Sequence, residues 1–404
     1  MDACGNKKAK LRSASCITDL NDDCLSAILN RISFQSVLMY KSVCKRWFDL
    51  ISSLDFVSGF IAHQTRNPPK QTELLLCSYG VPRNLSPLPN YLQLSLSFLP
   101  CYDHGKPQNV QIAGSSYDLC LCLDMDKFLC YICNPFTKDW VVLPPLPRKP
   151  LLAGFICDPY DGSVGINSDF KYEVVAVLEE YGPNQNSPTA EKMIRGKFFS
   201  SESRVWSDIS SSFAVNVMLN DYPLISPAVP YGKMVYWPAK NGIIIYITYI
   251  NRSFFFLPTR TTRPFTFRMC LGLSCDSLWT CQINQNWALI WKMDFVRKEM
   301  VLNKVDLSKM NMPLEIRNSF FTTGLRRGFH GEILALSPND PDVIYLTVDN
   351  SFVVSCNLRT GTWYDCGTLD RNLANVVMLS VPYWPTPVPS LAFNLPTEHL
   401  LAKK

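Results

Sequence analysis

The most constraining feature of this sequence is a series of short apolar runs that begins at Glu73 and continues through the last third of the chain. The runs are rich in Val, Ile, Tyr, Phe and Trp and are separated by turn-forming residues, which is the composition of β-strands. Examples are YLQLSLSF, YEVVAVL, IIIYITYI and VIYL. Few of the intervening stretches have helical periodicity, so strands and helices do not alternate. The sequence therefore predicts an all-β domain over residues 73–385 and disfavours a doubly wound sheet.

The strand runs recur as a coarse repeat. In each unit, a polar turn leads to a strand that begins with an aromatic or large apolar residue. The residues that mark this place in five units, 66, 49, 45 and 63 residues apart, are Trp140, Trp206, Phe255, Met300 and Trp363. Intervals near 50 residues are typical of kelch-type repeats, and a ring of small antiparallel sheets leaves few long exposed edges. We therefore predict a β-propeller of six to eight blades, in which residues 73–110 supply one or two units.

The segment Ile17–Phe56 differs from the rest because its apolar residues recur at helical spacing. Asp22 or Asp23 is placed to cap a first helix, since a carboxylate accepts hydrogen bonds from the free N–H groups of a first turn. A later group of apolar residues consists of Val43, Cys44, Trp47, Phe48, Leu50 and Ile51. This group wraps around more than one helical face, which is more than a unit of about forty residues can bury alone. Either the rest of the chain or another protein must cover the surplus.

The residues of this segment resemble the F-box. The matching positions are Leu20, Asp22, Leu25, Ile28, Leu29, Arg31, Ser36, Leu38, Lys41, Val43, Cys44, Lys45, Trp47, Leu50, Ile51, Ser52 and Phe56. The element V-C-K-x-W, Val43 to Trp47, is the most specific of them. The resemblance implies a three-helix F-box over residues 16–60, after a disordered basic tail at 1–15 and before a linker at 61–72.

Four positions depart from the usual F-box pattern. Asn21, Ser33 and Leu54 stand where prolines are common, and Met39 stands where a basic residue is common. Proline fixes φ at the start of a helix, so its loss is expected to loosen the turns between helices. The apolar positions are intact, so Asn21, Ser33 and Met39 bear on the strength of partner binding and not on the identity of the motif.

The strand-rich half is similar to the F-box-associated, kelch-like propeller domain of many plant F-box proteins. The segments that carry this similarity are CNPFTKDWVVLPPLP, GFICDPY, FFSSESRVWSDI and YGKMVYWPAKNG. Together the two resemblances imply a substrate-recognition subunit of an SCF-type ubiquitin ligase. Such a subunit is non-catalytic, binds a Skp-type adaptor and through it cullin and RING subunits, and holds a protein substrate on its propeller. The alternatives are a non-ligase interaction scaffold and a propeller that binds a small molecule or carbohydrate.

The resemblance also assigns candidate binding residues. The side chains that it implies for the adaptor contact, partly within the F-box core and partly at its surface, are Leu20, Leu25, Ile28, Leu29, Leu38, Val43, Cys44 and Trp47. For the substrate, the only candidates are Arg326 and Arg327, which lie between Gly324 and Gly328 and could grip an acidic peptide or a phosphate. A solvated turn between blades is the simpler explanation of that pair.

Motifs for catalysis, cofactors or metals are weak. Cys120, Cys122, Cys130 and Cys133 have the spacing C-x-C, seven residues, C-x-x-C. On strands the first two share a face and the last two do not, so a tetrahedral zinc site needs a distortion, and we expect buried thiols instead. The sequence has no G-x-S-x-G, P-loop or G-x-G-x-x-G motif and only four histidines, none of them paired. We therefore expect no catalytic residue, cofactor or metal.

Charge and cysteine usage bear on compartment and partners. Of the net charge of +5, residues 1–15 contribute +3 and residues 61–385 contribute only +2, so no basic block suited to nucleic acid is present. The sixteen cysteines are spread along the chain, unlike a small disulfide scaffold. We find no apolar leader, and the longest apolar run, Ile243–Ile250, is too short for a membrane span. We therefore expect a protein of the cytoplasm or nucleus, with a C-terminal tail at 386–404.

Overall fold

The structure is a computed structural model. The residues that it describes are 17–66, 73–77, 83–84, 95–103, 106–107, 110–159, 170–180, 193–209, 213–214, 227–239, 242–249, 252–258, 269–284, 287–294, 299–311, 331–348, 352–368, 376–380, 382 and 384–389. The chain divides into two compact units, and the first sequence boundary between them follows Pro69. We describe each unit by itself.

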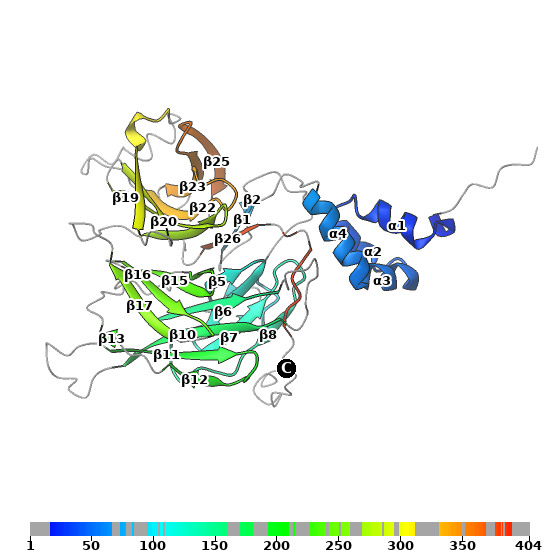
Figure 1. Cartoon of the computed structure of the whole chain (residues 1–404), viewed down its shortest axis with the longest axis horizontal. Coiled ribbons are helices and arrows are strands. Elements are labelled where there is room, and N and C mark those ends of the chain that lie inside the picture. The colour runs from blue at the N-terminus through cyan, green and yellow to red at the C-terminus, as the bar shows by residue number, and fades with distance from the viewer. Residues whose placement is uncertain are drawn as a thin grey trace, which may run out of the picture. The chain divides into compact units, whose positions relative to one another are not determined.

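The first unit contains four helices rather than the three expected (Figure 1). A short 3-10 turn, Ile17–Asp19, precedes α1 (Asp22–Leu29), α2 (Phe34–Tyr40), α3 (Lys45–Ser52) and α4 (Leu54–Arg66). The fourth helix includes residues 61–66, so the linker predicted for residues 61–72 does not begin at 61. It forms because Ser53 caps its first turn, accepting a hydrogen bond from the Phe56 N–H at 3.2 Å, and because Phe56 and Phe60 are both buried on one stripe.

The helix caps explain why prolines are dispensable in this unit. Asn21, not Asp22 or Asp23, is the N-cap of α1, and its side-chain oxygen accepts a hydrogen bond from the Cys24 N–H at 2.8 Å. Ser33 caps α2 in the same way through the Ser36 N–H, at 3.4 Å. Two of the departures from the F-box pattern are therefore capping residues. A capping side chain replaces the fixed φ of proline as the device that starts each helix.

The core of the first unit is already filled by its own side chains. Its buried apolar residues are Leu25, Leu29, Phe34, Val37, Trp47, Ile51, Phe56 and Phe60. Helix α4 also closes the end of α1, because the Gln64 side-chain amide donates to the Asn30 carbonyl at 3.0 Å. The unit therefore has a buried core of its own, and further large apolar side chains lie outside it.

The second unit is built from antiparallel sheets, which we call blades. Blade one comprises β5 (Val110–Ser116), β6 (Leu119–Asp124), β7 (Leu129–Cys133) and β8 (Trp140–Val142). Blade two comprises β9 (Leu152–Cys157), β10 (Tyr172–Glu180), β11 (Met193–Ser200) and β12 (Trp206–Asp208), with β13 (Phe213–Ala214) also paired to β11. Blade three comprises β14 (Val229–Tyr231), β15 (Met234–Ala239), β16 (Gly242–Ile247) and β17 (Ser253–Pro258).

Two more blades complete the series. Blade four comprises β18 (Cys270–Ser274), β19 (Ser277–Asn284), β20 (Trp287–Asp294) and β21 (Glu299–Asp306), followed by a 3-10 turn at Leu307–Lys309. Blade five comprises β22 (Gly331–Leu336), β23 (Val343–Val348), β24 (Phe352–Asn357) and β25 (Thr362–Thr368). Within the described residues the blade count is therefore five, and the expectation of six to eight was wrong.

The blades follow one another in a ring. Strand β5 contacts β9, β9 contacts β14 and β15, β14 contacts β18, and β18 contacts β22. A three-stranded sheet of β2 (Arg83–Asn84), β1 (Glu73–Cys77) and β26 (Val376–Ser380) completes the circuit, because β26 contacts both β22 and β5. Residues 73–110 therefore supply strands to this closing sheet and a small hairpin, β3 (Tyr102–Asp103) with β4 (Lys106–Pro107), instead of whole blades. The pairing of β1 with β26 joins the two ends of the domain.

The predicted repeat coincides with the blades. Trp140, Trp206, Phe255, Met300 and Trp363 each lie on the last strand of a blade, β8, β12, β17, β21 and β25 respectively. In three blades the turn before that strand also has a common construction, with a hydrogen bond from the fifth residue of the turn to the carbonyl of its first. The donor and acceptor pairs, with N···O distances of 2.8 to 2.9 Å, are Lys138 and Asn134, Arg204 and Ser200, and Gly361 and Asn357.

The C-terminal segment belongs to the propeller, contrary to the tail predicted from residue 386. Trp384, Pro385, Thr386 and Pro389 are buried, and Val388 packs against the core of the first three blades. None of the helices that the structure describes is long and apolar enough to cross a membrane.

Candidate functional site

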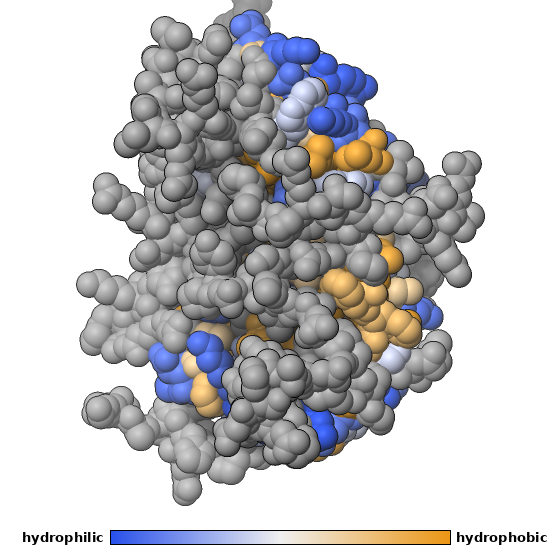
Figure 2. All heavy atoms as spheres, turned by 90° about the vertical axis from the view of Figure 1, so that its left-hand side faces the viewer, coloured by the Kyte–Doolittle hydropathy of each residue, from blue (hydrophilic) through white to orange (hydrophobic). Residues whose placement is uncertain are grey.

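Exposed apolar side chains are concentrated in the first unit. Among the described residues, twelve large hydrophobic side chains are exposed, and seven of them lie in the helical unit. We call these seven the helical apolar surface: Ile17, Ile28, Met39, Tyr40, Val43, Phe48 and Leu54. The other five are distributed over the five blades: Tyr117, Val205, Phe255, Leu302 and Tyr364. On the face shown in Figure 2, the described hydrophilic and apolar residues form small separate areas.

The eight residues predicted for partner binding divide into two groups. Leu25, Leu29 and Trp47 are buried in the core of the helical unit, so they cannot form a contact surface directly. Leu20 and Leu38 are partly exposed, and Ile28, Val43 and Cys44 are exposed. Sequence periodicity found the apolar positions but could not separate these groups, because an apolar stripe that packs inward and one that packs on a partner have the same spacing.

Sequence reasoning did not assign five members of the helical apolar surface to partner binding: Ile17, Met39, Tyr40, Phe48 and Leu54. A usable signal existed in α3. Trp47 and Ile51 are four residues apart and account for its buried stripe, so the neighbouring Phe48 had to point elsewhere. Apolar residues that fall outside the minimal buried stripe are the ones to examine for a partner contact.

Buried Trp47 positions part of the exposed surface. The ring centroids of Trp47 and Tyr40 are 5.6 Å apart and the rings meet edge to face. The Val43 N–H donates to the Tyr40 carbonyl at 3.1 Å, which fixes the turn between α2 and α3. The V-C-K-x-W element thus supplies one exposed apolar residue, Val43, and one buried ring that supports another, Tyr40.

A polar brace joins the starts of α1 and α3. The Arg46 guanidinium donates to the Asp22 carboxylate, with Nε···Oδ1 at 2.9 Å and Nη2···Oδ1 at 2.7 Å, and also to the Leu20 carbonyl. Both side chains are exposed, so this ion pair contributes at most about 1 kcal/mol to stability. Its clearer effect is geometric, because it holds the segment before α1 against the first turn of α3.

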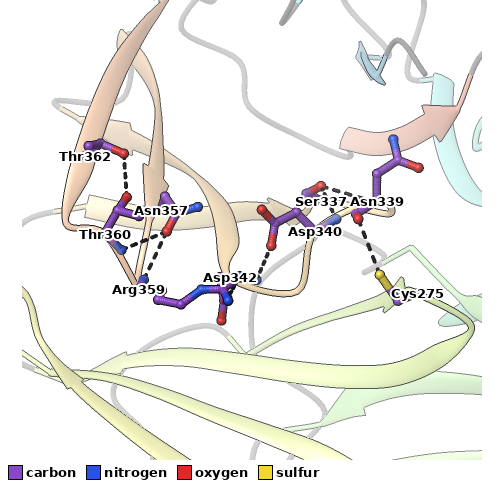
Figure 3. A network of polar contacts seen from close by, with 9 residues as sticks. All are labelled: Cys275, Ser337, Asn339, Asp340, Asp342, Asn357, Arg359, Thr360 and Thr362. Atoms are coloured by element: carbon purple, nitrogen blue, oxygen red, sulfur yellow. Dashed lines mark hydrogen bonds and ion pairs between the residues drawn. The ribbon is translucent and has the colours of Figure 1, made fainter. Parts of the chain in front are cut away.

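The propeller presents a second, polar surface, which we call the turn face. It is the end of the blades that carries the turns after the first and third strands, such as Ser337–Asp342 and Leu358–Gly361 in blade five (Figure 3). The Arg359 guanidinium pairs with the Asp342 carboxylate at 2.6 Å, and the Cys275 thiol of blade four donates to the Asn339 carbonyl at 3.3 Å. These contacts link neighbouring turns, whereas Arg326 and Arg327 lie outside the described residues.

The four cysteines of blade one are core residues. Cys120, Cys122, Cys130 and Cys133 are fully buried, and the Sγ atoms of Cys122 and Cys133 are 3.8 Å apart. Burial raises the pKa of the Cys130 thiol to about 12, so it stays protonated at neutral pH. Within the described part of the chain, no group of three or more potential ligands is arranged to hold a metal ion.

The two units correspond to two known domain families. Residues 17–58 match the F-box domain, and residues 85–378 match the family described as F-box protein At3g26010-like, beta-propeller. An F-box/kelch-repeat protein of Arabidopsis thaliana, At1g15680, is 27% identical over 206 residues, which are 44% of this chain and 47% of the relative. The F-box protein At5g49610 of the same plant is 28% identical over 151 residues, 34% of this chain and 39% of its own length.

The chain thus spans less than half the length of these curated relatives. A chain of the nidogen/laminin complex aligns with 78% of this chain and 99% of its own residues, at 10% identity and a TM-score of 0.40, which is too low to add to the assignment. The family assignment rests on the two domain matches, which cover most of the chain. The chain belongs to the F-box proteins that carry an At3g26010-like β-propeller.

Proposed function

We propose that this chain is the substrate-recognition subunit of an SCF-type ubiquitin ligase, in which the F-box binds a Skp-type adaptor and the propeller binds a target protein. The observation that carries the proposal is the helical apolar surface. Seven large apolar side chains are exposed on a unit of 50 described residues whose core is already filled. Large exposed apolar side chains at this frequency support a protein contact on this unit, because large exposed apolar areas mark interaction sites.

The two units would divide the work between them. Exposed Val43, Phe48 and Met39 are the anchors that we propose for the adaptor, because a few buried apolar side chains carry most of the affinity of an interface. The propeller would hold the target, so that linkage through the adaptor raises the concentration of target near the charged conjugating enzyme. Ubiquitin transfer would then require no nucleophile from this chain.

The proposal includes the cellular compartment in which the protein acts. We propose the cytoplasm or the nucleus, where adaptor, cullin and RING subunits would be encountered. Thirteen described cysteines are free thiols, which suits a reducing compartment. A disulfide found in the protein isolated under conditions that block thiol exchange would contradict this assignment.

The adaptor interface is tested with exposed residues, since changes in buried Leu29 or Trp47 would unfold the unit and say nothing about binding. Val43→Asp and Phe48→Asp in the full chain are each expected to weaken co-purification with a recombinant Skp-type adaptor at least tenfold, which corresponds to about 1.4 kcal/mol. Phe255→Asp is the matched control, because Phe255 is equally exposed but lies on blade three. Undiminished adaptor binding by both F-box variants would refute the interface, and adaptor recovered without cullin would favour a non-ligase scaffold.

A further inference from the structure

Two tyrosines of the turn face have a backbone conformation that bulky residues avoid. Tyr117, in the turn between β5 and β6, has φ 56° and is 52% exposed. Tyr249, in the turn between β16 and β17, has φ 62°. A residue that has a Cβ atom is destabilised in left-handed backbone, whereas glycine is not. Residues held in this conformation cluster at functional sites. The corresponding first turn of blade three uses glycine, Gly232, at φ 56°.

Strand β9 brings an acidic residue beside the first of these tyrosines. The Cys157 N–H and thiol both donate to the Ser116 hydroxyl, at 3.4 and 3.3 Å, so the next residue, Asp158, lies beside Tyr117. Cys157 is also the register partner of Tyr172, whose neighbour Glu173 faces blade three. Glu173 accepts hydrogen bonds there from the Tyr246 hydroxyl at 2.6 Å and the Arg252 guanidinium at 3.2 Å. Tyr246 and Arg252 flank Tyr249 in the chain.

The pKa shifts of the two tyrosines agree with a position of Asp158 near both of them. Burial raises the pKa of the Tyr117 hydroxyl, and the nearby Cys157 and Asp158 raise it further. Burial, then Glu173, then Cys157 and Asp158 raise the pKa of Tyr249. Both phenols therefore sense the same carboxylate across the junction of blades one to three.

Two groups at this junction have no partner among the described residues. The Asp158 side chain is exposed and forms no ion pair or hydrogen bond there, whereas the nearby cations are engaged, Lys171 by Glu202 and Arg252 by Glu173. The Tyr249 hydroxyl is buried and is not hydrogen-bonded within the described part of the chain. Buried hydroxyls without a hydrogen-bond partner are uncommon in folded proteins.

We propose that Tyr117, Asp158 and Tyr249 form a docking site for an arginine side chain of the target protein. The site offers an exposed carboxylate and an exposed aromatic ring, which match the guanidinium as a forked donor and a planar cation. An acidic side chain would meet the charge of Asp158 with both neighbouring cations already paired. The inference rests on the proposed function, since it names the chemistry by which the propeller selects its target.

The test uses the full chain and a peptide array. Each probe is a twelve-residue peptide with one fixed central residue, arginine, citrulline or glutamate, in an otherwise randomised background of Gly, Ser, Ala and Leu. Citrulline keeps the shape of arginine without its charge. We expect the wild-type chain to bind the arginine set at least fivefold more than the citrulline set, and Asp158→Asn to reduce that ratio to about one, because the favourable charge pairing is lost.

Tyr117→Gly separates binding from folding. Glycine accepts φ 56° without strain, so this variant is expected to lose the preference for arginine while its Tm stays the same or rises. The matched controls are Asp276→Asn, at an exposed carboxylate in the first turn of blade four, and Tyr364→Ala, at an exposed tyrosine on β25. Both are expected to keep the wild-type ratio.

Equal binding of the arginine and citrulline sets by the wild type, or a preference that survives Asp158→Asn, would overturn the proposal. Adaptor binding is measured on the same preparations. A chain that prefers arginine peptides but does not hold the adaptor would refute the ligase role alone, and the docking site would stand. A chain that holds the adaptor without any arginine preference would refute the docking site alone.

Discussion

Removal of one hydroxyl, by Thr386→Val, tests whether the C-terminal segment is part of the propeller. Asp118, in the first turn of blade one, is 1% exposed and accepts hydrogen bonds from the Asn134 side-chain amide at 2.7 Å, from the Thr386 N–H at 2.9 Å and from the Thr386 hydroxyl. The hydroxyl is the partner of Oδ1, and the other two donors share Oδ2. Valine keeps the shape of threonine and leaves Oδ1 without that donor.

The loss of stability expected for Thr386→Val follows from the buried hydrogen bond that it removes. A hydrogen bond to a charged group contributes about 1.5–3 kcal/mol, and an acceptor left unsatisfied in the interior costs its desolvation as well. We take about 2 kcal/mol for Thr386→Val. With a shift near 2 °C per kcal/mol, as for larger domains, Tm is expected to fall by about 4 °C. Thr386→Ser, which keeps the hydroxyl and loses only a methyl group, is expected to lose less than half of that.

The measurement is thermal unfolding of the full chain, followed by far-UV circular dichroism, at neutral pH. Adaptor binding by both variants is expected to stay at the wild-type level, since the change lies in the propeller. A Tm for Thr386→Val equal to that of wild type would refute the reasoning. That result would mean that the segment 384–389 does not hold blade one in the way that the buried contacts indicate.

Two further predictions concern a second buried carboxylate, Glu173, and the dependence of stability on the ionisation of Asp118. Tyr246→Phe is expected to destabilise the propeller by about 1.5–3 kcal/mol, because the fully buried Glu173 keeps only its contact with Arg252, and urea unfolding with an unchanged m-value would measure it. Burial raises the pKa of Asp118 despite its hydrogen bonds, so the folded state binds the proton more readily than the unfolded state. Stability is therefore expected to fall as pH rises from about 4 through the raised pKa, and Asp118→Asn is expected to remove that slope even though it lowers stability overall. A slope that persists in Asp118→Asn would assign it to another group.

Short-range sequence patterns correctly predicted the structural features that depend on neighbouring residues, namely the last strand of each blade and the helical segment. Polar turns followed by aromatic strands located the last strand of each blade, because the same side chains that form the turn also start the strand. The helical segment was located by its apolar spacing. The cap of its first helix was assigned to the wrong residue, because Asn21 and the two following aspartates can all cap a helix and only the backbone conformation decides between them.

Contacts between distant residues could not be predicted in this way. Asp118 and Thr386 are 268 positions apart, and no periodicity relates a turn of blade one to a proline-rich segment near the end of the chain. The closing sheet could not be predicted for the same reason, because its paired strands β1 and β26 come from opposite ends of the propeller sequence. The blade count was overestimated for this reason, because residues 73–110 were taken as one or two separate blades.

The two surfaces differ in a way that fits different kinds of partner. The F-box exposes large apolar side chains outside its buried core, and burial of such residues against a partner depends little on charge or orientation. The turn face instead presents the exposed carboxylate of Asp158 near two tyrosines with left-handed backbone, and the contact that we propose there is more selective, because a wrong side chain leaves Asp158 unpaired. An adaptor that serves many receptors suits the first kind of surface. A target that must be distinguished from other proteins suits the second. Substitutions at Tyr117 and Tyr249 are therefore expected to reduce selectivity for the target first.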